Sequence, residues 1–473
     1  MSVEQPIASS RASQPLAVIV LAAGLGTRMK SEIPKVMHPV CGRPLLACVL
    51  DAAAALDPAH VVVVTGAGDD DPVAAALPSG VQRAVQTERL GSGDALRAGM
   101  TGLADFAGDV MVLIGDAPLA GAELLVGLRR HHVECAARAT ITSVVLADPA
   151  QYGRVVRNAG GDLTAIVEAR DASPEELSIT EINSGFYVFD AAELRRFLPT
   201  LTADNAQGEY YLTDLVDRFL QAGDQVAAFL TADVEASMGV NSRVDLAQVN
   251  AIMRARILER LMLDGVTIDD PASTYVDWGV TVGCDTVLRP QTMLTGATSV
   301  GAGCMVGPGC FLADVTVDDG ATIISSHLIG CRVGPGASVG PFTHVRPGTE
   351  LGPSSRAGSF VEIKKSRVGT GSKVPHLSYV GDTTIGDNTN IGAGTITANY
   401  DGERKHPTMI GSFVRVGSDT VFVAPVTVGD RAVIGAGSVI TKDVPEGALG
   451  VARCRQENVE GYADRRRLRP DRA

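Results

Sequence analysis

The chain has 473 residues, of which 45% are hydrophobic, and its 54 acidic and 41 basic residues give a formal net charge of −13. This length accommodates at least two domains with buried cores, and the negative charge argues against a general nucleic-acid-binding protein, because such binding needs a basic surface. The eight cysteines lack the paired spacing of zinc and redox motifs. No apolar run approaches the roughly 20 residues of a membrane span, so we expect a cytoplasmic protein without one.

The amino-terminal segment, residues 1–15, is polar and rich in serine, which predicts a disordered extension. Residues 17–23 then form a continuous apolar run. A run of this kind is expected for a parallel strand that is covered on both faces, because neither side of the strand needs polar residues.

A glycine turn with two cations follows this strand. Gly24 and Gly26 lack a Cβ, so their backbone N–H groups can approach anions closely. Arg28 offers a forked donor and Lys35 a point charge, both suited to phosphate. The Walker and dinucleotide glycine patterns are absent. Glycines alone would equally suit a plain strand-to-helix turn, but together with the cations they predict a site for the phosphates of a nucleoside triphosphate.

Through about residue 240, strand-like runs alternate with helix-like segments rich in alanine and leucine, and the clearest strands are residues 61–65, 110–115 and 141–146. This alternation predicts a parallel sheet with crossover helices. Asp116 directly follows one of these strands, at the edge where open α/β sheets bind ligands. Its carboxylate suits Mg²⁺, although a strand-ending turn is the alternative interpretation.

A change of pattern divides the chain near residue 265. Residues 244–264 have apolar side chains at helical spacing, which predicts a linker helix. Residues 265–452 carry small apolar residues at intervals of six, often followed by glycine, which predicts a solenoid with those residues pointing inward. The longest unbroken series is Val333, Val339, Val345, Leu351 and Ala357. Residues 453–473 form a basic carboxyl-terminal tail.

The repeat fails in two places. Between Ile396 and Ile410, both interpreted as inward, the spacing is too long, which predicts a loop that projects from the solenoid and carries Asn399 and Tyr400. A second irregularity, between Ala357 and Val368, carries Glu362, Lys364 and Lys365.

His376 lies inside otherwise aliphatic repeat sequence. A lone histidine of this kind is often structural, but an imidazole can also act as a base near neutral pH, as acetyl transfer to an amine requires. Arg346 and Lys364 could bind a phosphorylated substrate, and further polar contacts could come from Tyr379, Asn390, Asn399 and Tyr400.

Several motifs resemble known families. The pattern LAAGLGTRM…PKV resembles the signature of sugar-phosphate nucleotidyltransferases, and the six-residue units resemble hexapeptide repeats. Over nearly the whole chain, QTERLGSGDA, IGDAPL, YGRVV, IVEARDA, EINSGFY, NAQGEYYLTD and GVNSR resemble the bacterial N-acetylglucosamine-1-phosphate uridyltransferase/glucosamine-1-phosphate acetyltransferase family. The resemblance implies an α/β Rossmann-like nucleotidyltransferase domain at 16–243, followed by a left-handed parallel β-helix of triangular section that carries the acetyltransferase.

The resemblance also implies a uridyltransferase site. Its nucleotide-binding residues would be Leu21, Ala22, Ala23, Gly24, Gly26, Arg28, Lys35, Gln86, Gly91 and Ser92. Of these, Gln86, Gly91 and Ser92 would face the uracil end of the nucleotide. Its sugar-phosphate residues would be Gly153, Glu168, Asn183, Tyr211, Thr213 and Asn241, and Asp116 and Asn241 would hold Mg²⁺. Three positions depart from the family pattern: Ser92 replaces a usual threonine, Asp94 a usual histidine and Ile114 a usual tyrosine.

For the acetyltransferase, the resemblance implies that His376 is the general base. Glucosamine 1-phosphate would be bound by Arg346, Lys364, Tyr379 and Asn390, and acetyl-CoA by Ala393, Asn399, Tyr400, Ser418, Ala436 and Arg453.

The function implied by the resemblance has two steps. Acetyl-CoA and glucosamine 1-phosphate would give N-acetylglucosamine 1-phosphate, which would react with UTP, in the presence of Mg²⁺, to give UDP-N-acetylglucosamine and pyrophosphate. The family assembles as a homotrimer with acetyltransferase sites between subunits. One alternative is a single-activity nucleotidyltransferase with a regulatory or oligomerising β-helix, and another is a non-catalytic assembly scaffold.

Overall fold

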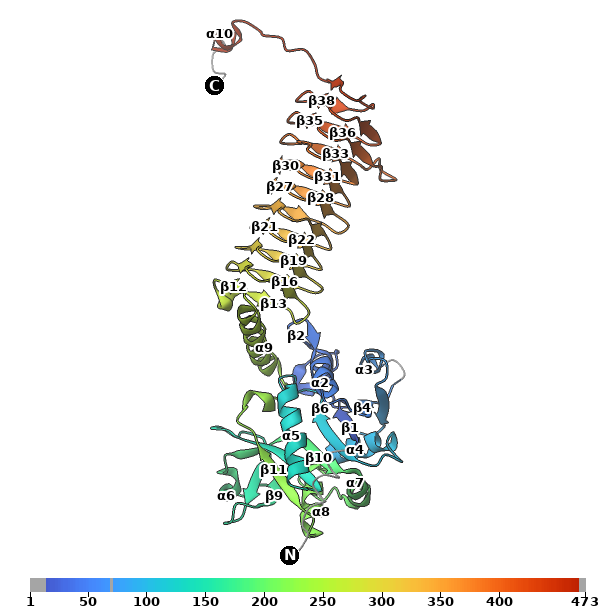
Figure 1. The fold of residues 1–473 in the computed structure, drawn as a ribbon, viewed down its shortest axis with the longest axis vertical. Helices are drawn as coiled ribbons and strands as arrows, with labels where there is room; N and C mark the ends of the chain where they lie inside the picture. The colour runs from blue at the N-terminus through green and yellow to red at the C-terminus, as the bar shows by residue number, and fades with distance from the viewer. Residues whose placement is uncertain (1–13, 69–70, 468–473) are drawn as a thin grey trace, which may run out of the picture. The chain divides into compact units, whose positions relative to one another are not determined.

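The computed structural model describes residues 14–68 and 71–467. The chain divides into two compact units after Met253 (Figure 1). Apart from residues 14 and 15, the predicted disordered extension lies outside the described residues. Helix α9 (Arg243–Leu263), where the linker helix is predicted, begins in the first unit and ends in the second.

A nine-stranded sheet forms the first unit. Its main path runs through β11 (Val226–Leu230), β7 (Ala139–Val145), β10 (Glu181–Asp190), β6 (Asp109–Ile114), β1 (Leu16–Leu21), β4 (His60–Gly66) and β5 (Gln82–Gln86). A hairpin of β8 (Arg154–Arg157) and β9 (Leu163–Val167) joins this path through β10. Strands β4, β6 and β7 confirm the three strands predicted from the apolar runs.

The prediction of a parallel sheet is wrong at β10, which runs antiparallel to both β6 and β7. Strands β4 and β6 run parallel to β1, and β5 runs parallel to β4, as predicted. The chain reaches β10 through the β8–β9 hairpin and the short helix α6 (Pro174–Leu177) instead of a long crossover helix. It therefore enters β10 from the opposite end of the sheet.

Two hydrophobic cores cover the two faces of this sheet. Ile19 of β1 packs in the core that includes residues of α4 (Ser92–Thr101), α7 (Ala191–Phe197) and α8 (Thr213–Gln221). Val18 and Val20 pack in the core that includes residues of α2 (Leu45–Ala54) and α5 (Ala122–Glu134). Burial on both sides explains the continuous apolar run. Smaller elements of this unit are β2 (Pro39–Val40), β3 (Arg43–Pro44), α3 (Pro72–Ala75), η1 (Thr27–Met29), η2 (Lys35–Met37), η3 (Leu198–Thr200) and η4 (Glu235–Ser237).

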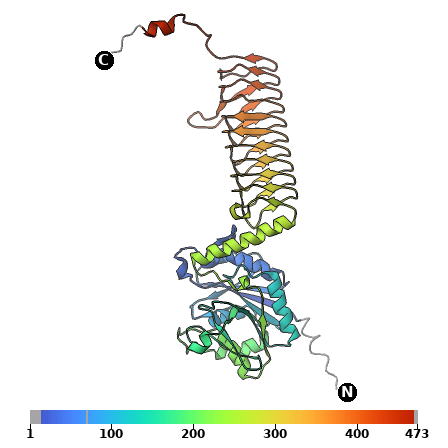
Figure 2. The ribbon, with the colours of Figure 1, turned by 90° about the vertical axis from the view of Figure 1, so that its left-hand side faces the viewer.

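The second unit is a parallel β-helix, whose stacked coils are visible in Figures 1 and 2. We number its three faces in the order in which the chain meets them. The first face extends from β12 (Thr267–Ile268) to β30 (Lys373–His376), continues through Asn390, and ends in β35 (Arg415–Val416), β38 (Val433–Ile434) and β40 (Leu449–Gly450). The second face extends from β13 (Tyr275–Val276) to β39 (Val439–Ile440), and the third from β14 (Thr281–Val282) to β37 (Val426–Val428).

Inward-pointing residues confirm the predicted repeat. Val333, Val345 and Ala357 are fully buried, and Val339 and Leu351 are each 2% exposed. Because successive coils pair in register, each inward side chain stacks on its counterpart in the next coil and excludes water along the interior.

The structure corrects one inward residue next to the projecting loop. In β33 (Ile396–Ala398) Thr397 is 1% exposed, whereas Ile396 is 37% exposed, so Ile396 was wrongly predicted to point inward. The Thr397 hydroxyl accepts a hydrogen bond from the N–H of Gly381 at 2.8 Å, which makes a buried threonine acceptable. Residues 399–407 leave the coil as predicted and return at β34 (Thr408–Ile410), and a bridge between Tyr400 and Lys405 closes the loop on itself.

After β40 the chain continues without regular structure to α10 (Tyr462–Arg467). Across the described residues, helices are either too short or too polar to cross a membrane.

Candidate active sites

The carboxyl ends of β1 and β6 open into a cavity of about 560 Å³. From the predicted nucleotide set it is lined by Leu21, Ala22, Ala23, Gly24, Gly26, Lys35, Gln86, Gly91 and Ser92. Asp116 and Ile114 also line it. Arg28 is the exception, because it is exposed on η1 and is not part of the lining. Residues predicted from three separate motifs therefore meet in one cavity.

Gly26 fixes the path of the turn after β1. It adopts a φ of 60°, in the left-handed region, and a Cβ there would lie 2.6 Å from the Cβ of Lys35. A side chain at this position would both strain the backbone and displace Lys35. Gly24 has no atom within 4 Å of the place of a Cβ, so it leaves open space for a ligand.

Lys35, Asp116 and Asn241 converge at this cavity from distant parts of the chain. The ammonium of Lys35 donates to the carboxylate of Asp116 and, at 3.1 Å, to Oδ1 of Asn241. Lys35 and Asp116 have side chains that are only 13% and 15% exposed. The N–H of Val240 donates to the Asp116 carbonyl at 2.9 Å, which holds the segment before Asn241 beside the end of β6.

Asp116 and Asn241 offer two oxygen atoms to a single cation, the ammonium of Lys35. Mg²⁺ prefers oxygen ligands and is commonly held by one or two protein oxygens together with water and substrate phosphates. Among the described residues, no group of three or more histidine, cysteine, aspartate and glutamate side chains could hold a metal ion without such help. The donor pair therefore fits a Mg²⁺ ion that shares its coordination with phosphate.

The predicted base-binding residues lie at the end of β5 and the start of α4. Gly91 has a φ of 113°, and a Cβ there would lie 2.5 Å from the carbonyl oxygen of Tyr210. The hydroxyl of Ser92 accepts a hydrogen bond from the N–H of Leu212 at 3.0 Å. Gln86 ends β5, and its Nε2 donates to the Gly91 carbonyl at 3.1 Å. The turn before α4 is thus held rigidly against residues 210–212.

Four residues of the predicted sugar-phosphate set lie together near the start of β8: Gly153, Glu168, Asn183 and Thr213. The hydroxyl of Thr213 donates to Oε1 of Glu168 at 3.1 Å, and a Cβ on Gly153 would lie 3.5 Å from Oε2 of Glu168. The N–H of Asn183 donates to the Gly153 carbonyl at 2.9 Å. Burial raises the pKa of Glu168, and Tyr211 is 7% exposed with its hydroxyl bonded to Gln207. Asn241 instead joins Asp116 at the nucleotide cavity.

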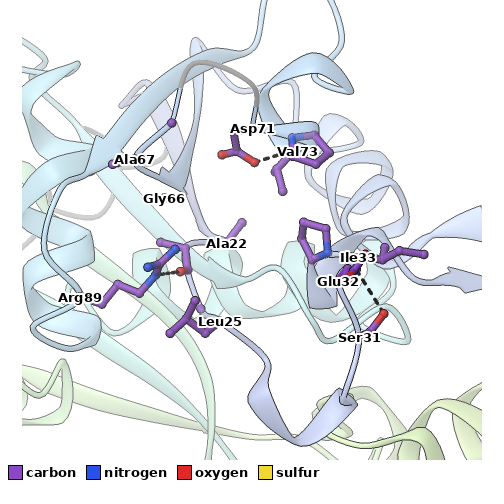
Figure 3. Close-up of a pocket in the computed structure, with 15 residues that line it drawn as sticks. Ala22, Leu25, Ser31, Glu32, Ile33, Gly66, Ala67, Asp71, Val73 and Arg89 are labelled. Carbon is purple, nitrogen blue, oxygen red and sulfur yellow. Dashed lines mark hydrogen bonds between the residues drawn. The ribbon is translucent and has the colours of Figure 1, made fainter.

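Figure 3 shows a second cavity of the first unit, of about 520 Å³, which shares residues 22–25 and Arg89 with the nucleotide cavity. The Nε of Arg89 donates to the carbonyl of Ala23 at 2.8 Å. Its Nη2 lies 2.6 Å from the place that a Cβ of Gly66 would occupy. Arg89 therefore connects the predicted phosphate turn, the end of β4 and the base-binding segment that contains it.

In the second unit, the predicted general base, His376, lies at the edge between the first and second faces. Part of the predicted acetyl-CoA-binding set lies along the same edge. Backbone hydrogen bonds join successive coils there, from the N–H groups of Gly394, Asp419 and Gly437 to the carbonyls of His376 (3.4 Å), Ala393 (2.7 Å) and Ser418 (2.8 Å). Ala436 precedes Gly437, and the Cδ of Arg453 lies 3.9 Å from the place of a Cβ on Gly437. Adjacent strands lie about 4.8 Å apart, so the line of residues from His376 to Arg453 extends for about 19 Å along this edge.

Cations gather at the next edge, between the second and third faces. Arg346 follows β25 (His344–Val345), Lys364 ends β28 (Glu362–Lys364), and the register of these strands stacks the two cations in neighbouring coils. Arg346 donates to Glu362 at 2.9 Å. A hydrogen bond with Lys405 is the main cause that lowers the pKa of Lys364. The projecting loop is held at this edge by Asn399, whose Nδ2 donates to Oδ2 of Asp382 at 2.5 Å.

A single chain does not gather the predicted acetyltransferase residues into one pocket. His376 ends β30 on the first face, and the chain turns a corner at Leu377 and crosses the second face before it reaches Gly381, the register partner of Lys364. Tyr379 is half-buried on the second face between them, and Asn390 lies on the first face between Lys373 and Arg415. On the second face a cavity of about 420 Å³ is lined by Tyr379 and Glu362 and by the exposed Phe342, Phe360 and Leu377.

Sequence reasoning missed three residues of these sites. Arg89 and Glu209 line the nucleotide cavity. Arg89 lies in the motif QTERLGSGDA and Glu209 in NAQGEYYLTD, so the motifs themselves could have indicated both residues. Lys405 approaches Lys364, and its place in the predicted projecting loop could have indicated it.

Comparisons with known proteins agree with this arrangement. Residues 18–175 match the family described as the MobA-like NTP transferase domain, and residues 407–442 match bacterial transferase hexapeptide repeats. The chain is 49% identical to the bifunctional protein GlmU of Mycolicibacterium vanbaalenii, over 95% of the chain and 93% of that protein. It is also 49% identical to the bifunctional protein GlmU of Corynebacterium glutamicum, over 95% of the chain and 94% of that protein. The similarity therefore covers both units.

Proposed function

The chain belongs to the family of bifunctional GlmU proteins, acetyltransferase/uridyltransferases that make UDP-N-acetylglucosamine, and we propose that its two structural units divide the two reactions. The second unit acetylates glucosamine 1-phosphate with acetyl-CoA. The first unit transfers UMP from UTP to N-acetylglucosamine 1-phosphate and releases pyrophosphate. The observation that carries the assignment is the convergence of Lys35, Asp116 and Asn241 at a cavity lined by the predicted nucleotide residues.

In the first unit, we assign the phosphates of UTP to the glycine turn and Lys35. The exposed Arg28 is available to the outer phosphates on the same turn. Gln86, Gly91 and Ser92 face the base, while the group around Glu168 and Thr213 faces the sugar. Mg²⁺ bound by Asp116 and Asn241 would neutralise charge on the triphosphate. The sugar phosphate is already an anionic nucleophile, so positioning and charge stabilisation suffice for attack on the α-phosphorus.

In the second unit, we assign acetyl-CoA to the edge that runs from His376 to Arg453. The length of this line suits an extended coenzyme, with its thioester near His376 and a phosphate near Arg453. His376 is exposed and can take the proton that the attacking amine loses. Arg346, Lys364 and Lys405 form a cationic group suited to the phosphate of glucosamine 1-phosphate.

A second copy of the chain completes this site in the proposal. Within the described residues of one chain, His376 and the cationic group lie at opposite edges of the second face. Phe342, Phe360 and Leu377 form an exposed apolar column beside His376, with exposed fractions of 61%, 60% and 63%. Burying this column against another subunit would stabilise assembly. A homotrimer with acetyltransferase sites between subunits accounts for both observations.

A cytoplasmic location is also part of the proposal. All eight cysteines lie in the part of the chain that the structure describes, and none of them forms a disulfide there. Free thiols suit a reducing compartment.

The two reactions can be tested separately in the intact protein and in His376→Ala and Asp116→Ala variants. Release of the CoA thiol is followed with glucosamine 1-phosphate and acetyl-CoA, and release of pyrophosphate with N-acetylglucosamine 1-phosphate, UTP and Mg²⁺. We expect His376→Ala to lose only thiol release and Asp116→Ala to lose only pyrophosphate release. Loss of both activities in either well-folded variant would contradict two separate sites.

A further inference from the structure

We propose that Asp94 is a specificity-determining residue, which selects uracil over cytosine by fixing the orientation of the Gln86 side-chain amide. The inference rests on the proposed transfer of UMP in the first unit. It goes further by identifying how this chain distinguishes the base of its nucleotide substrate.

Gln86 is held from two sides by acceptors. The residue lines the nucleotide cavity and is only 5% exposed. Its Nε2 donates to the carbonyl of Gly91 at 3.1 Å and to Oδ2 of Asp94 at 2.9 Å. A carbonyl and an ionised carboxylate can accept hydrogen bonds but cannot donate them. The amide nitrogen must therefore face Gly91 and Asp94, and both of its hydrogens are used there.

This arrangement leaves the Gln86 carbonyl oxygen as the polar atom available to a ligand. Within the described parts of the chain, no donor forms a hydrogen bond with Oε1 of Gln86. The base-binding end of the cavity thus presents a fixed acceptor. A ligand that offers a donor to this oxygen gains a hydrogen bond, whereas a ligand that offers a lone pair leaves two acceptors facing each other.

Uracil and cytosine differ in this respect. Position N3 carries a hydrogen in uracil and a lone pair in cytosine, so N3 of uracil can donate to Oε1 of Gln86 and N3 of cytosine cannot. If the amide of Gln86 rotated by half a turn, its NH₂ group would face the cavity and the preference would be reversed. Selection of uracil therefore depends on what prevents that rotation.

Asp94 prevents the rotation because its own position is fixed. It lies in the first turn of α4, where a negative charge is favoured by the helix dipole. Its other carboxylate oxygen, Oδ1, lies 3.4 Å from Nη1 of Arg97. The histidine usual at this position in the resembling family could present a donor or an acceptor. The carboxylate in this chain accepts only, and this makes the orientation of Gln86 unambiguous.

The test compares nucleotides in the full-length protein. Pyrophosphate release with N-acetylglucosamine 1-phosphate and Mg²⁺ is measured for UTP, CTP and N3-methyl-UTP, in the wild type and in Asp94→Ala, Asp94→Asn and Glu88→Ala variants. Glu88→Ala is the matched control, because it removes one exposed negative charge from the same segment. The melting temperature of the first unit reports whether each variant is folded.

We expect the wild type to favour UTP over both CTP and N3-methyl-UTP. In Asp94→Ala, the ratio of kcat/KM for UTP to that for CTP should fall about tenfold, the value of one charge-assisted hydrogen bond. Asp94→Asn keeps an acceptor oxygen and should lose less of this ratio than Asp94→Ala, and Glu88→Ala should keep it.

Three results would overturn the role of Asp94. They are an unchanged ratio in Asp94→Ala, an equal loss of kcat/KM for UTP and CTP, and equal losses of the ratio in Asp94→Ala and Asp94→Asn. A wild type that releases no pyrophosphate with any nucleotide would instead refute the proposed UMP transfer, so the two failures are distinguishable.

Discussion

The ammonium of Lys35 is hydrogen-bonded to the carboxylate of Asp116 at the edge of the nucleotide cavity. Asp116 is also a proposed Mg²⁺ ligand, so the same carboxylate would bind both Lys35 and Mg²⁺. Opposite charges this close and this little exposed attract each other strongly. Lys35 and Mg²⁺ should therefore compete for Asp116 when no nucleotide is bound, and both should be needed when the triphosphate brings additional negative charge.

The competition predicts opposite effects of one substitution. In Lys35→Met, divalent-cation binding without nucleotide should tighten about fivefold, because the competing ammonium is gone. The kcat/KM for UTP should fall at least about tenfold, because a phosphate contact is lost. Titration with Mn²⁺, followed by its electron paramagnetic resonance signal, measures the first effect. Arg28→Met is the control for Mn²⁺ binding alone, since Arg28 is exposed and does not line the cavity with Asp116. Weaker Mn²⁺ binding in Lys35→Met would contradict the competition.

Arg89 should hold the phosphate turn in place through its bond to the Ala23 carbonyl. We expect Arg89→Gln to raise the KM for UTP about fivefold, in proportion to one lost hydrogen bond, with kcat nearly unchanged. Gly66→Ala tests the same contact without changing Arg89, because the new Cβ would lie 2.6 Å from Nη2. Steady-state kinetics of pyrophosphate release measure both. If Gly66→Ala left the KM for UTP unaltered while Arg89→Gln raised it, the position of Arg89 over Gly66 would not matter.

Local sequence patterns predicted most strands and most buried positions. They did not predict features that depend on contacts between residues distant in the sequence. The six-residue spacing predicted the buried positions of the β-helix, and the apolar run predicted β1, because side-chain period reflects burial directly. The direction of β10 was missed, since hydrophobicity does not record the end from which a strand is entered. Ile396 was predicted to point inward because it is apolar, but Thr397 takes the inward position, and the bond from Gly381 satisfies its buried hydroxyl.

In the candidate sites too, the sequence predicted individual residues but not the contacts between them. Motifs predicted Lys35, Asp116 and Asn241 individually, and their meeting depends on the fold of three distant segments. The bond between Gln86 and Asp94 was not predictable from spacing, because only the structure shows which way the amide faces.

Asp217 on α8 should make the first unit less stable at neutral pH. Burial, and then the nearby charge of Asp214, raise the pKa of Asp217 to about 6. The folded state therefore binds a proton more tightly than the unfolded state, and stability falls as pH rises from about 4 to above 6. Full burial with this shift would cost about 3 kcal/mol. Asp217 is half-buried, so after allowing for solvent screening we expect about 1 kcal/mol.

Asp217→Asn removes this cost and should raise the melting temperature of the first unit at pH 7.5. The gain should vanish below about pH 4, where Asp217 is protonated in both states. Melting curves at the two pH values measure it, and the exposed Asp105→Asn should show neither effect. A gain that persisted at low pH would show that the charge of Asp217 is not its cause.

The apolar column beside His376 should be required for one activity only. Phe342 and Phe360 stack with ring centroids 5.2 Å apart, and Leu377 continues the column next to His376. In Leu377→Asp, a charge would have to be buried against the second copy, so the assembly should dissociate. Acetyl transfer should then be lost, while UMP transfer should stay within about twofold of the wild type, as expected when a change leaves a site's own contacts intact. Phe413→Asp is the matched control, because Phe413 is 58% exposed at the edge between the third and first faces. Light scattering gives the oligomeric state, and a dissociated Leu377→Asp protein that still acetylates glucosamine 1-phosphate would show that one chain completes the site alone.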